Sequence, residues 1–132
     1  MTDILQGYVL DASAVLALLN QELGANKVEQ ALLLPNTCMS SVQLAEVVAK
    51  LIAVGVPIYK AHEIMQMLAI SIVSLDEEIA LKSAELMPVA KPLGLSLGDR
   101  ACLATSIVLK LPALTADKVW LQVPNVSVEF IR

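Results

Sequence analysis

The stretch YVLDASAVLALLN, residues 8–20, contains the pattern on which the fold prediction rests. Tyr8, Val9 and Leu10 form a short apolar run with strand character, and Asp11 follows it directly. Residues 12–19 then have the composition of a compact helix that ends near residue 20. A strand followed at once by a helix is the first unit of an α/β domain, with the acid at the carboxyl end of its first strand.

The rest of the chain repeats this alternation of short apolar runs and helical segments. We therefore predict a single domain over residues 1–132, an α/β fold with a short, mainly parallel central sheet and helices on both faces. The expected strands cover residues 8–10, 38–40, 70–75, 112–115 and 127–130. The expected helices cover residues 12–19, 25–34, a stretch from Ser40 or Ser41 to Gly55, residues 57–68, a stretch from Asp76 to Pro88, and residues 97–109, with an irregular link around Pro88 and Pro92.

The third of these helices contains a run of apolar residues at helical spacing. That spacing predicts the face by which the helix packs on the core, and it puts Glu46 at the edge of the buried stripe. The stripe consists of Val42, Ala45, Val48, Ala49 and Ile52.

Composition and charge narrow the class of protein. Of the 132 residues, 57% are hydrophobic, which suits helices layered on a buried sheet. Because no segment has the character of a membrane span or an export signal, we expect a cytoplasmic protein with no membrane partner. Cys38 and Cys102 lie in apolar sequence without close spacing, which indicates buried thiols in a reducing compartment. The net charge of -4 argues against nucleic-acid binding through a broad basic face, although a local basic rim remains open.

Four acidic residues lie where strands end or where the next helices begin. They are Asp11 in YVLDASA, Glu46 in SSVQLAEVV, Asp99 in LSLGDRACLA and Asp117 in ALTADKVW. The carboxyl ends of parallel strands meet at one edge of a sheet, so these side chains can converge there. Buried carboxylates at close range are costly unless their charge is compensated, and a divalent cation is the usual compensation. A metal site is therefore the leading hypothesis.

Each acid also has a simpler structural interpretation. Asp11 is a good cap for the helix that follows it. Glu46 is spaced to pair with Lys50 on one helix face. Asp99 is placed to interact with the dipole of its own helix, and Asp117 has the ordinary chemistry of a turn. The metal hypothesis is preferred for all four acids, and the case for it is weakest for Asp117.

Taken in order, these fragments resemble the PIN-domain nuclease family, in particular the VapC-like toxins of toxin–antitoxin pairs. The resemblance extends from Tyr8 to Ile131. The family pattern combines an Asp at the first strand end and a small hydroxyl residue two positions on, a Glu after a Ser-rich helix start, an Asp in LSLxD, and an acid after a strand ending in Thr. Those positions are occupied here by Asp11, Ser13, Glu46, Asp99 and Asp117. Two departures are Ala116, where the family often has a basic residue, and Gly98, where Ala is commoner.

The resemblance implies a three-layer α/β/α PIN-like fold and a Mg²⁺- or Mn²⁺-dependent endoribonuclease. Such an enzyme hydrolyses RNA phosphodiester bonds with a metal-activated water and leaves a 5′-phosphate and a 3′-hydroxyl. By this resemblance Asp11 and Asp99 are direct metal ligands. Glu46 and Asp117 bind directly, bind through water, or position the attacking water. The residues implied to orient these carboxylates by hydrogen bonds are Ser13 and Thr115.

Similar toxins bind a cognate antitoxin, and PIN domains commonly form dimers. The expected partners are therefore an RNA substrate, a cognate antitoxin and a second copy of the chain. The predicted helix at residues 57–68 has more apolar surface than one core-facing side needs. Tyr59, Met65 and Met67 are candidate partner-binding residues, because flexible methionines on a partly exposed face suit the binding of another helix. A role in the core alone remains equally open.

Other functions are compatible with parts of the pattern. One alternative is a PIN-like protein that is not a toxin, either an orphan RNA-processing nuclease or a catalytically weak binding or assembly module. A phosphoacceptor receiver or an aspartyl-phosphate phosphatase is disfavoured, because the first strand end has one Asp and Ser13 stands where the phosphatase needs a second. The single histidine, His62, supports no Ser/His/Asp set. Arg100 remains open between a phosphate contact and a surface ion pair.

Overall fold

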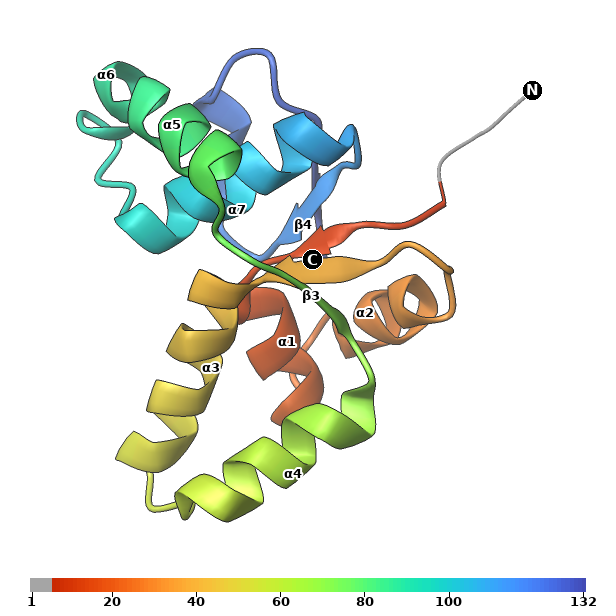
Figure 1. The fold of residues 1–132 in the computed structure, drawn as a ribbon. Helices are drawn as coiled ribbons and strands as arrows, with labels where there is room; N and C mark the ends of the chain where they lie inside the picture. The colour runs from red at the N-terminus through yellow and green to blue at the C-terminus, as the bar shows by residue number, and fades with distance from the viewer. Residues whose placement is uncertain (1–5) are drawn as a thin grey trace.

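The computed structural model describes residues 6–132, in which one sheet of five parallel strands lies between two layers of helices (Figure 1). The strand order is β3-β2-β1-β4-β5, and this architecture confirms the predicted three-layer α/β/α fold. The strands are β1 (Val9–Leu10), β2 (Cys38–Ser40), β3 (Ser71–Val73), β4 (Ala113–Thr115) and β5 (Val128–Phe130). The helices are α1 (Ala12–Leu19), α2 (Ala25–Leu32), α3 (Ser41–Ala53), α4 (Ile58–Leu68), α5 (Glu77–Glu85), α6 (Met87–Ala90), α7 (Leu97–Leu109) and the 3₁₀ helix η1 (Lys118–Gln122).

The three central strands supply both hydrophobic cores, because successive residues of a strand point to opposite faces of the sheet. Helices α1 to α4 cover one face, and α5, α6 and α7 cover the other (Figure 1). Leu10, Met39 and Leu114 enter the core on the side of α1 to α4, and Val9, Cys38 and Ala113 enter the core on the side of α7. Cys38 and Cys102 are free and buried, as the sequence predicts. Within residues 6–132, no helix combines the length and apolar character needed to cross a bilayer.

The register of the central strands decides which residues share the carboxyl edge of the sheet. Strand β1 pairs with β4 so that Leu10 lies beside Leu114. The next residue of each strand, Asp11 and Thr115, therefore comes at the same level, and the Asp11 amide donates to the Leu114 carbonyl at 3.2 Å. This pairing brings two segments about a hundred positions apart in sequence into direct contact.

Three secondary-structure elements differ from the prediction. Strand β3 covers three residues rather than the six expected. The predicted irregular link contains the short helix α6, with Pro88 in its first turn, where proline lacks only an amide that the helix does not use. The 3₁₀ helix η1 was not predicted, and it buries Trp120 completely in the second core.

The buried face of α3 also differs from the predicted stripe. Its buried residues are Gln43, Val47 and Leu51, whereas Ala45, Ala49 and Ile52 are exposed. Nine of the 13 residues of this helix are apolar and lie on most of its circumference, so hydrophobic spacing alone does not select one face. The observed rotation has one consequence for the site, because it puts a polar amide inside the protein one turn before Glu46.

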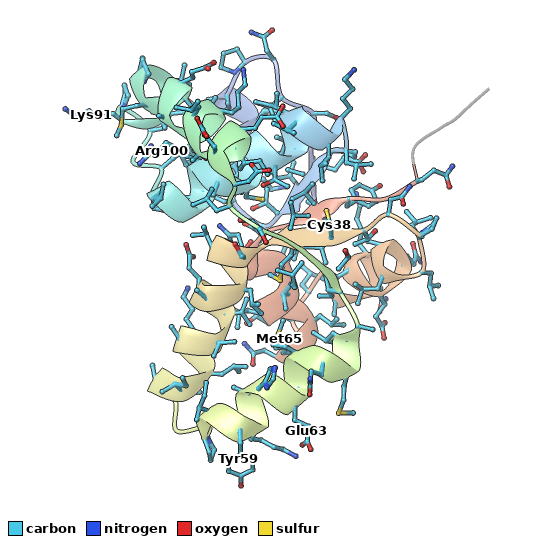
Figure 2. All side chains as sticks on the ribbon, viewed as in Figure 1. Cys38, Tyr59, Glu63, Met65, Lys91 and Arg100 are labelled. Carbon is cyan, nitrogen blue, oxygen red and sulfur yellow. The ribbon has the colours of Figure 1, made fainter. Side chains whose placement is uncertain are left out.

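Helix α4 presents only part of the predicted partner surface. Tyr59 and Met67 are 75% and 79% exposed, and Tyr59 points away from the body of the protein (Figure 2). The expectation that Met65 is also exposed is wrong, because Met65 is only 7% exposed and packs into the core of α1 to α4. Its apolar side chain is the floor of a surface hollow rather than a projecting contact.

Candidate functional site

Asp11 is the most deeply buried of the four acids, with 4% of its surface exposed. It is the N-cap of α1, and its Oδ1 accepts the amide of Ala14 at 2.9 Å. This is the capping role that the sequence allowed. Two further donors occupy the same carboxylate, so capping accounts for only part of its surroundings.

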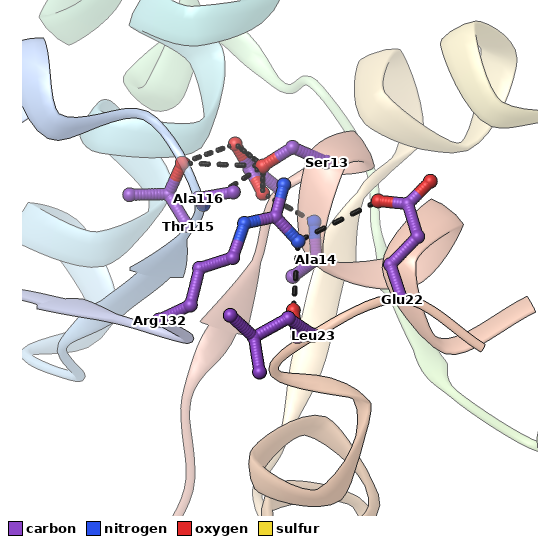
Figure 3. A network of polar contacts seen from close by, with 8 residues as sticks. Ser13, Ala14, Glu22, Leu23, Thr115, Ala116 and Arg132 are labelled. Carbon is purple, nitrogen blue, oxygen red and sulfur yellow. Dashed lines mark hydrogen bonds and ion pairs between the residues drawn. The ribbon is translucent and has the colours of Figure 1, made fainter. Parts of the chain in front are cut away.

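The hydroxyls of Ser13 and Thr115 both donate to Asp11 (Figure 3). The distances are 2.7 Å from Ser13 to Oδ1 and 2.6 Å from Thr115 to Oδ2. Each hydroxyl is held in turn by the segment after β4, since Ser13 accepts the amide of Ala116 and Thr115 accepts the amide of Asp117. These bonds join the end of β4 to the start of α1 and fix the orientation of the Asp11 carboxylate.

Burial raises the pKa of Asp11 from 3.8 to about 6. Desolvation is the largest cause, and the charge of Asp99 raises this pKa further. The bonds from Thr115, Ser13 and Ala14 act in the opposite direction without cancelling the desolvation. The ionised carboxylate is therefore destabilised in the metal-free protein at neutral pH.

Glu46 lies on α3 with its carboxylate against the backbone of α7. A Cβ atom built on Gly98 would lie 1.7 Å from the Glu46 Oε1 atom, so the carboxylate occupies the space that any other residue at position 98 would fill. Burial and the nearby charge of Asp99 raise the pKa of Glu46, and Lys50 lowers it. The sequence allowed Glu46 to pair with Lys50. Among the described residues the two form no salt bridge, and Lys50 acts on Glu46 only through the smaller, opposing effect of its charge on the pKa.

Asp99 lies in the first turn of α7 and forms a capping box with Ser96. The Asp99 amide donates to the Ser96 hydroxyl at 3.2 Å, and the Asp99 Oδ2 atom accepts the Ser96 amide at 2.9 Å. On the same helix face, Cys102, Leu103 and Ser106 are buried. Asp99 therefore lies at the boundary between a buried helix face and solvent.

Asp117 is the acid least involved with the others. It is exposed and caps η1, because its Oδ1 atom accepts the amide of Val119 at 3.0 Å. Its main-chain amide donates to Thr115, so its backbone belongs to the network around Asp11 although its carboxylate turns toward η1. In this arrangement it has the turn role that the sequence also allowed.

Asp11, Glu46 and Asp99 surround one region at the carboxyl edge of the sheet. The pKa of Cys102 is raised well above its ordinary value, and burial is the largest cause. The charges of all three acids also raise it. Four ion pairs form among residues 6–132, and none of them includes any of the four acids. In the same residues, no three His, Cys, Asp or Glu side chains are gathered into an arrangement that holds a metal ion as it stands.

Basic side chains border this edge on the side of β5. Arg132 follows β5 and donates to the Leu23 carbonyl at 2.7 Å, and its guanidinium is 3.5 Å from the Glu22 carboxylate (Figure 3). The Lys118 ammonium lies 4.4 Å from the centroid of the Phe130 ring and donates to a main-chain oxygen of Arg132. Arg100 is not part of this border, since it bonds the Ser83 carbonyl between α5 and α7 (Figure 2).

The sequence prediction missed Gln43 as a component of the site. This residue is 1% exposed, and its side chain bonds the amide of Ala12 and the carbonyl of Gly98. The only signal in the sequence was a polar residue one turn ahead of Glu46 in a helix with nine apolar residues among its 13. That signal is too weak to distinguish an interior amide from a surface one.

Comparisons with known proteins bear on the family and the fold. The sequence model of the PIN domain family matches residues 8–126. A toxin–antitoxin complex from Klebsiella pneumoniae is 19% identical, with a TM-score of 0.74 over 96% of this chain and 98% of that one. DNA-bound VapBC from Salmonella typhimurium is 13% identical, with a TM-score of 0.76 over 97% and 100% of the two chains. VapBC-1 from nontypeable Haemophilus influenzae is 20% identical, with a TM-score of 0.73 over 94% and 97%. Identities this low establish a shared fold alone, and no curated protein matches the sequence.

The burial of Asp11 predicts a pH-dependent gain in stability for Asp11→Asn. A carboxyl whose folded pKa is raised loses stability as pH rises from its unfolded pKa of 3.8 to its folded pKa of about 6, a shift equivalent to about 3 kcal/mol. Asn removes the charge but keeps an oxygen for the Ala14 amide. In metal-free buffer, the difference in unfolding free energy between variant and wild type should grow from near zero below about pH 4 to about 3 kcal/mol in favour of the variant above about pH 6.

Urea denaturation between these pH values, in the presence of a chelator, measures that difference. The matched control is Asp117→Asn, since Asp117 also caps a helical turn but is exposed. The control should change stability by only a few tenths of a kcal/mol at every pH. A destabilised Asp11→Asn variant at pH 7, or a difference that does not vary with pH, would contradict this account of the site.

Proposed function

Because the chain belongs to the PIN domain family, a family of nucleases, we propose that it is a Mg²⁺- or Mn²⁺-dependent endoribonuclease that acts as the toxin of a toxin–antitoxin pair. The observation that carries the proposal is the group of carboxylates at the carboxyl edge of the sheet. Asp11 is buried there and forms no ion pair with a basic residue of 6–132. Asp99 is near enough for its charge to raise the pKa of both Asp11 and Glu46.

The donor set fits a hard divalent cation. Mg²⁺ and Mn²⁺ prefer oxygen ligands, and a few carboxylates together with water and substrate phosphate complete the shell of such an ion. A cation among Asp11, Glu46 and Asp99 also relieves the repulsion and the desolvation that raise the pKa of Asp11. Asp11 and Asp99 are the proposed direct ligands, and Glu46 and Asp117 are proposed to bind directly or through water. The capping bonds of Asp99 and Asp117 lie near the surface, where rotation of a side chain costs little.

When bound, such an ion lowers the pKa of a coordinated water and neutralises charge that develops at the scissile phosphate. The chain itself supplies orientation and partial desolvation of the carboxylates. Ser13 and Thr115 hold the Asp11 carboxylate in one position through their hydroxyls, which limits the reorganisation needed when the ion binds. Glu46, held against Gly98, is placed beside Asp99 to accept a proton from an attacking water or to hold that water.

The basic side chains at this edge of the sheet give the group of carboxylates a means to engage RNA. The family often has a basic residue directly before its fourth acid, and this chain has Ala116 there. Lys118 and Arg132 provide positive charge on the other side of that acid. We propose that they contact the phosphate backbone of the substrate. Because only a few local positive charges are needed for such contacts, the negative net charge of the protein is compatible with RNA binding.

Helices α3 and α4 form the proposed antitoxin-binding surface. An apolar hollow between them, the α3–α4 groove, is lined by Leu44, Val48, Ile58, Tyr59, His62 and Met65. Its exposed rim and buried floor suit an amphipathic helix that inserts apolar side chains. The similar Klebsiella structure is itself a toxin–antitoxin complex, which supports an antitoxin partner for this chain. A homodimer remains a further proposal for the same exposed apolar surface.

The catalytic proposal predicts that Asp99→Asn abolishes metal-dependent RNA cleavage. Loss of a direct ligand should reduce the cleavage rate by at least about 100-fold, because even outer-shell partners of a metal typically contribute 10- to 100-fold. The Asn oxygen can still accept the Ser96 amide, so the variant should fold. Cleavage of a labelled single-stranded RNA and of a structured RNA, with Mg²⁺ or Mn²⁺, gives the rate.

Asp76→Asn is the matched control for this experiment. Asp76 caps α5 by accepting the amide of Ile79 at 2.9 Å, so the substitution is chemically the same but lies at a different helix start. It should leave cleavage unchanged. Equal cleavage by the wild type in excess chelator would reject the metal role, and full activity of Asp99→Asn would remove Asp99 from the site. Absence of RNA cleavage by a folded, metal-loaded wild type would favour the binding-module alternative.

The partner proposal predicts that Tyr59→Lys and Met67→Lys weaken association without unfolding the protein. Both side chains are largely exposed in the monomer, so a positive charge there is tolerated until a partner covers it. Co-purification with the co-expressed product of a neighbouring antitoxin-like reading frame, and sedimentation equilibrium of the protein alone, measure the two associations. Leu81→Lys is the control, because Leu81 is a 58% exposed leucine on α5, on the opposite face of the sheet. Unchanged association of both variants would defeat the proposal.

A further inference from the structure

One buried side chain connects the three helices that bear Asp11, Glu46 and Asp99. Gln43 lies on α3, one turn before Glu46, and is 1% exposed. Its Oε1 atom accepts the amide of Ala12, the first residue of α1, at 2.5 Å. Its Nε2 atom donates to the carbonyl of Gly98, at the start of α7, at 2.6 Å. Ala12 directly follows Asp11, and Gly98 directly precedes Asp99.

The two bonds fix the orientation of the Gln43 amide. The Ala12 amide can only donate and the Gly98 carbonyl can only accept, so a flipped amide would lose both partners. The Ala12 amide also has no partner within its own helix, because the first amides of an α-helix have no carbonyl one turn earlier. Gln43 therefore accepts a hydrogen bond from an α1 amide that has no partner in its own helix. With the same side-chain amide it also binds the start of α7 and so sets the distance from α3 to α7.

Glycine at position 98 leaves room for this connection. A Cβ built there would lie 3.2 Å from the Gln43 Nε2 atom as well as 1.7 Å from the Glu46 Oε1 atom. The absent side chain lets two residues of one α3 face approach the backbone of α7 together. Gly98, which stands where the family more often has Ala, thus occurs in this chain together with the hydrogen bond from Gln43 to the Gly98 carbonyl.

We propose that Gln43 is a positioning residue that holds the starts of α1, α3 and α7 at the separation at which Asp11, Glu46 and Asp99 bind the cation. The proposal rests on the proposed function for the identity of that cation as Mg²⁺ or Mn²⁺. Gln43 does not touch the ion or the substrate in this role. It acts through the backbone beside Asp11 and Asp99 and through its own helix, which bears Glu46.

Direct measurement of Mn²⁺ binding tests this role without relying on cleavage. Gln43→Met keeps the size of the side chain and removes both hydrogen bonds. Gln43→Asn keeps the amide but is one methylene too short to reach both partners, and it provides a second variant should Gln43→Met fail to fold. Calorimetric titration of each with Mn²⁺ should give an affinity at least about 10-fold weaker than the wild type, the range found for residues that orient metal ligands.

Val47→Ala is the control for stability alone. Val47 is fully buried on the same helix, next to Glu46, and belongs to the hydrophobic core. Its truncation should destabilise the fold by about 1–3 kcal/mol but leave the Mn²⁺ affinity within about twofold of the wild type. Wild-type affinity in both Gln43 variants, or an equal loss in Val47→Ala, would overturn the positioning role.

A metal-free measurement separates this proposal from the proposed function. In Gln43→Met, amide hydrogen exchange at Ala12 should accelerate at least about 10-fold more than exchange at the globally protected amides of β1 and β4. In Val47→Ala, exchange at Ala12 should change only by the same factor as exchange at those amides. A wild type that bound no Mn²⁺ would reject the proposed function. The exchange rate at Ala12 would then still decide whether Gln43 ties the three helix starts, and unchanged protection there would reject the tie.

Discussion

The constraint on which the site depends is the burial of one carboxylate, Asp11, which has no positive partner in the part of the chain that the structure describes. The parallel pairing of β1 with β4 puts Asp11 beside Thr115 at the carboxyl edge of the sheet, under α1 and close to the start of α7. Three hydrogen-bond donors contact the carboxylate, and its pKa is still raised to about 6. Hydrogen bonds to neutral hydroxyls and an amide orient a charge, but they do not replace the hydration that burial removes. The fold therefore maintains an anion that it does not fully stabilise.

An arrangement of this kind is typical of a site kept for function rather than for stability. Replacement of Asp11 by a neutral residue should stabilise the metal-free protein, and selection for stability alone would favour that change. The neighbouring contacts point the same way, because Glu46 and Asp99 add negative charge to the same region instead of neutralising it. A ligand that binds the folded state and supplies positive charge recovers the lost free energy by mass action. The proposed cation is such a ligand.

The sequence predicted those parts of the structure that depend on local chemistry. The strand ahead of Asp11, the helix over residues 97–109 and the burial of Cys102 were each predicted from a few consecutive residues. The orientation of α3 was not predictable, because nine of its 13 residues are apolar and lie on most of the helix circumference, and only tertiary packing selects Gln43, Val47 and Leu51. Met65 failed for the same reason, since a methionine stripe on a helix does not reveal which members face the core. Gln43 became significant only once the fold had brought Ala12 and Gly98 to within reach of its amide.

The structural roles of the acids are compatible with the metal-binding roles proposed for them. Asp11, Asp99 and Asp117 each accept a backbone amide at the start of a helical segment, and the helix starts meet at the carboxyl edge because every strand is parallel. A carboxylate at an exposed helix start gains about 0.3–1 kcal/mol from the helix dipole. That gain is smaller than the cost of about 3 kcal/mol implied by the raised pKa of Asp11, so the dipoles alone do not balance the charge. Capping thus explains how three separate helices bring acids to one edge, and the remaining imbalance explains why that edge should attract a divalent cation.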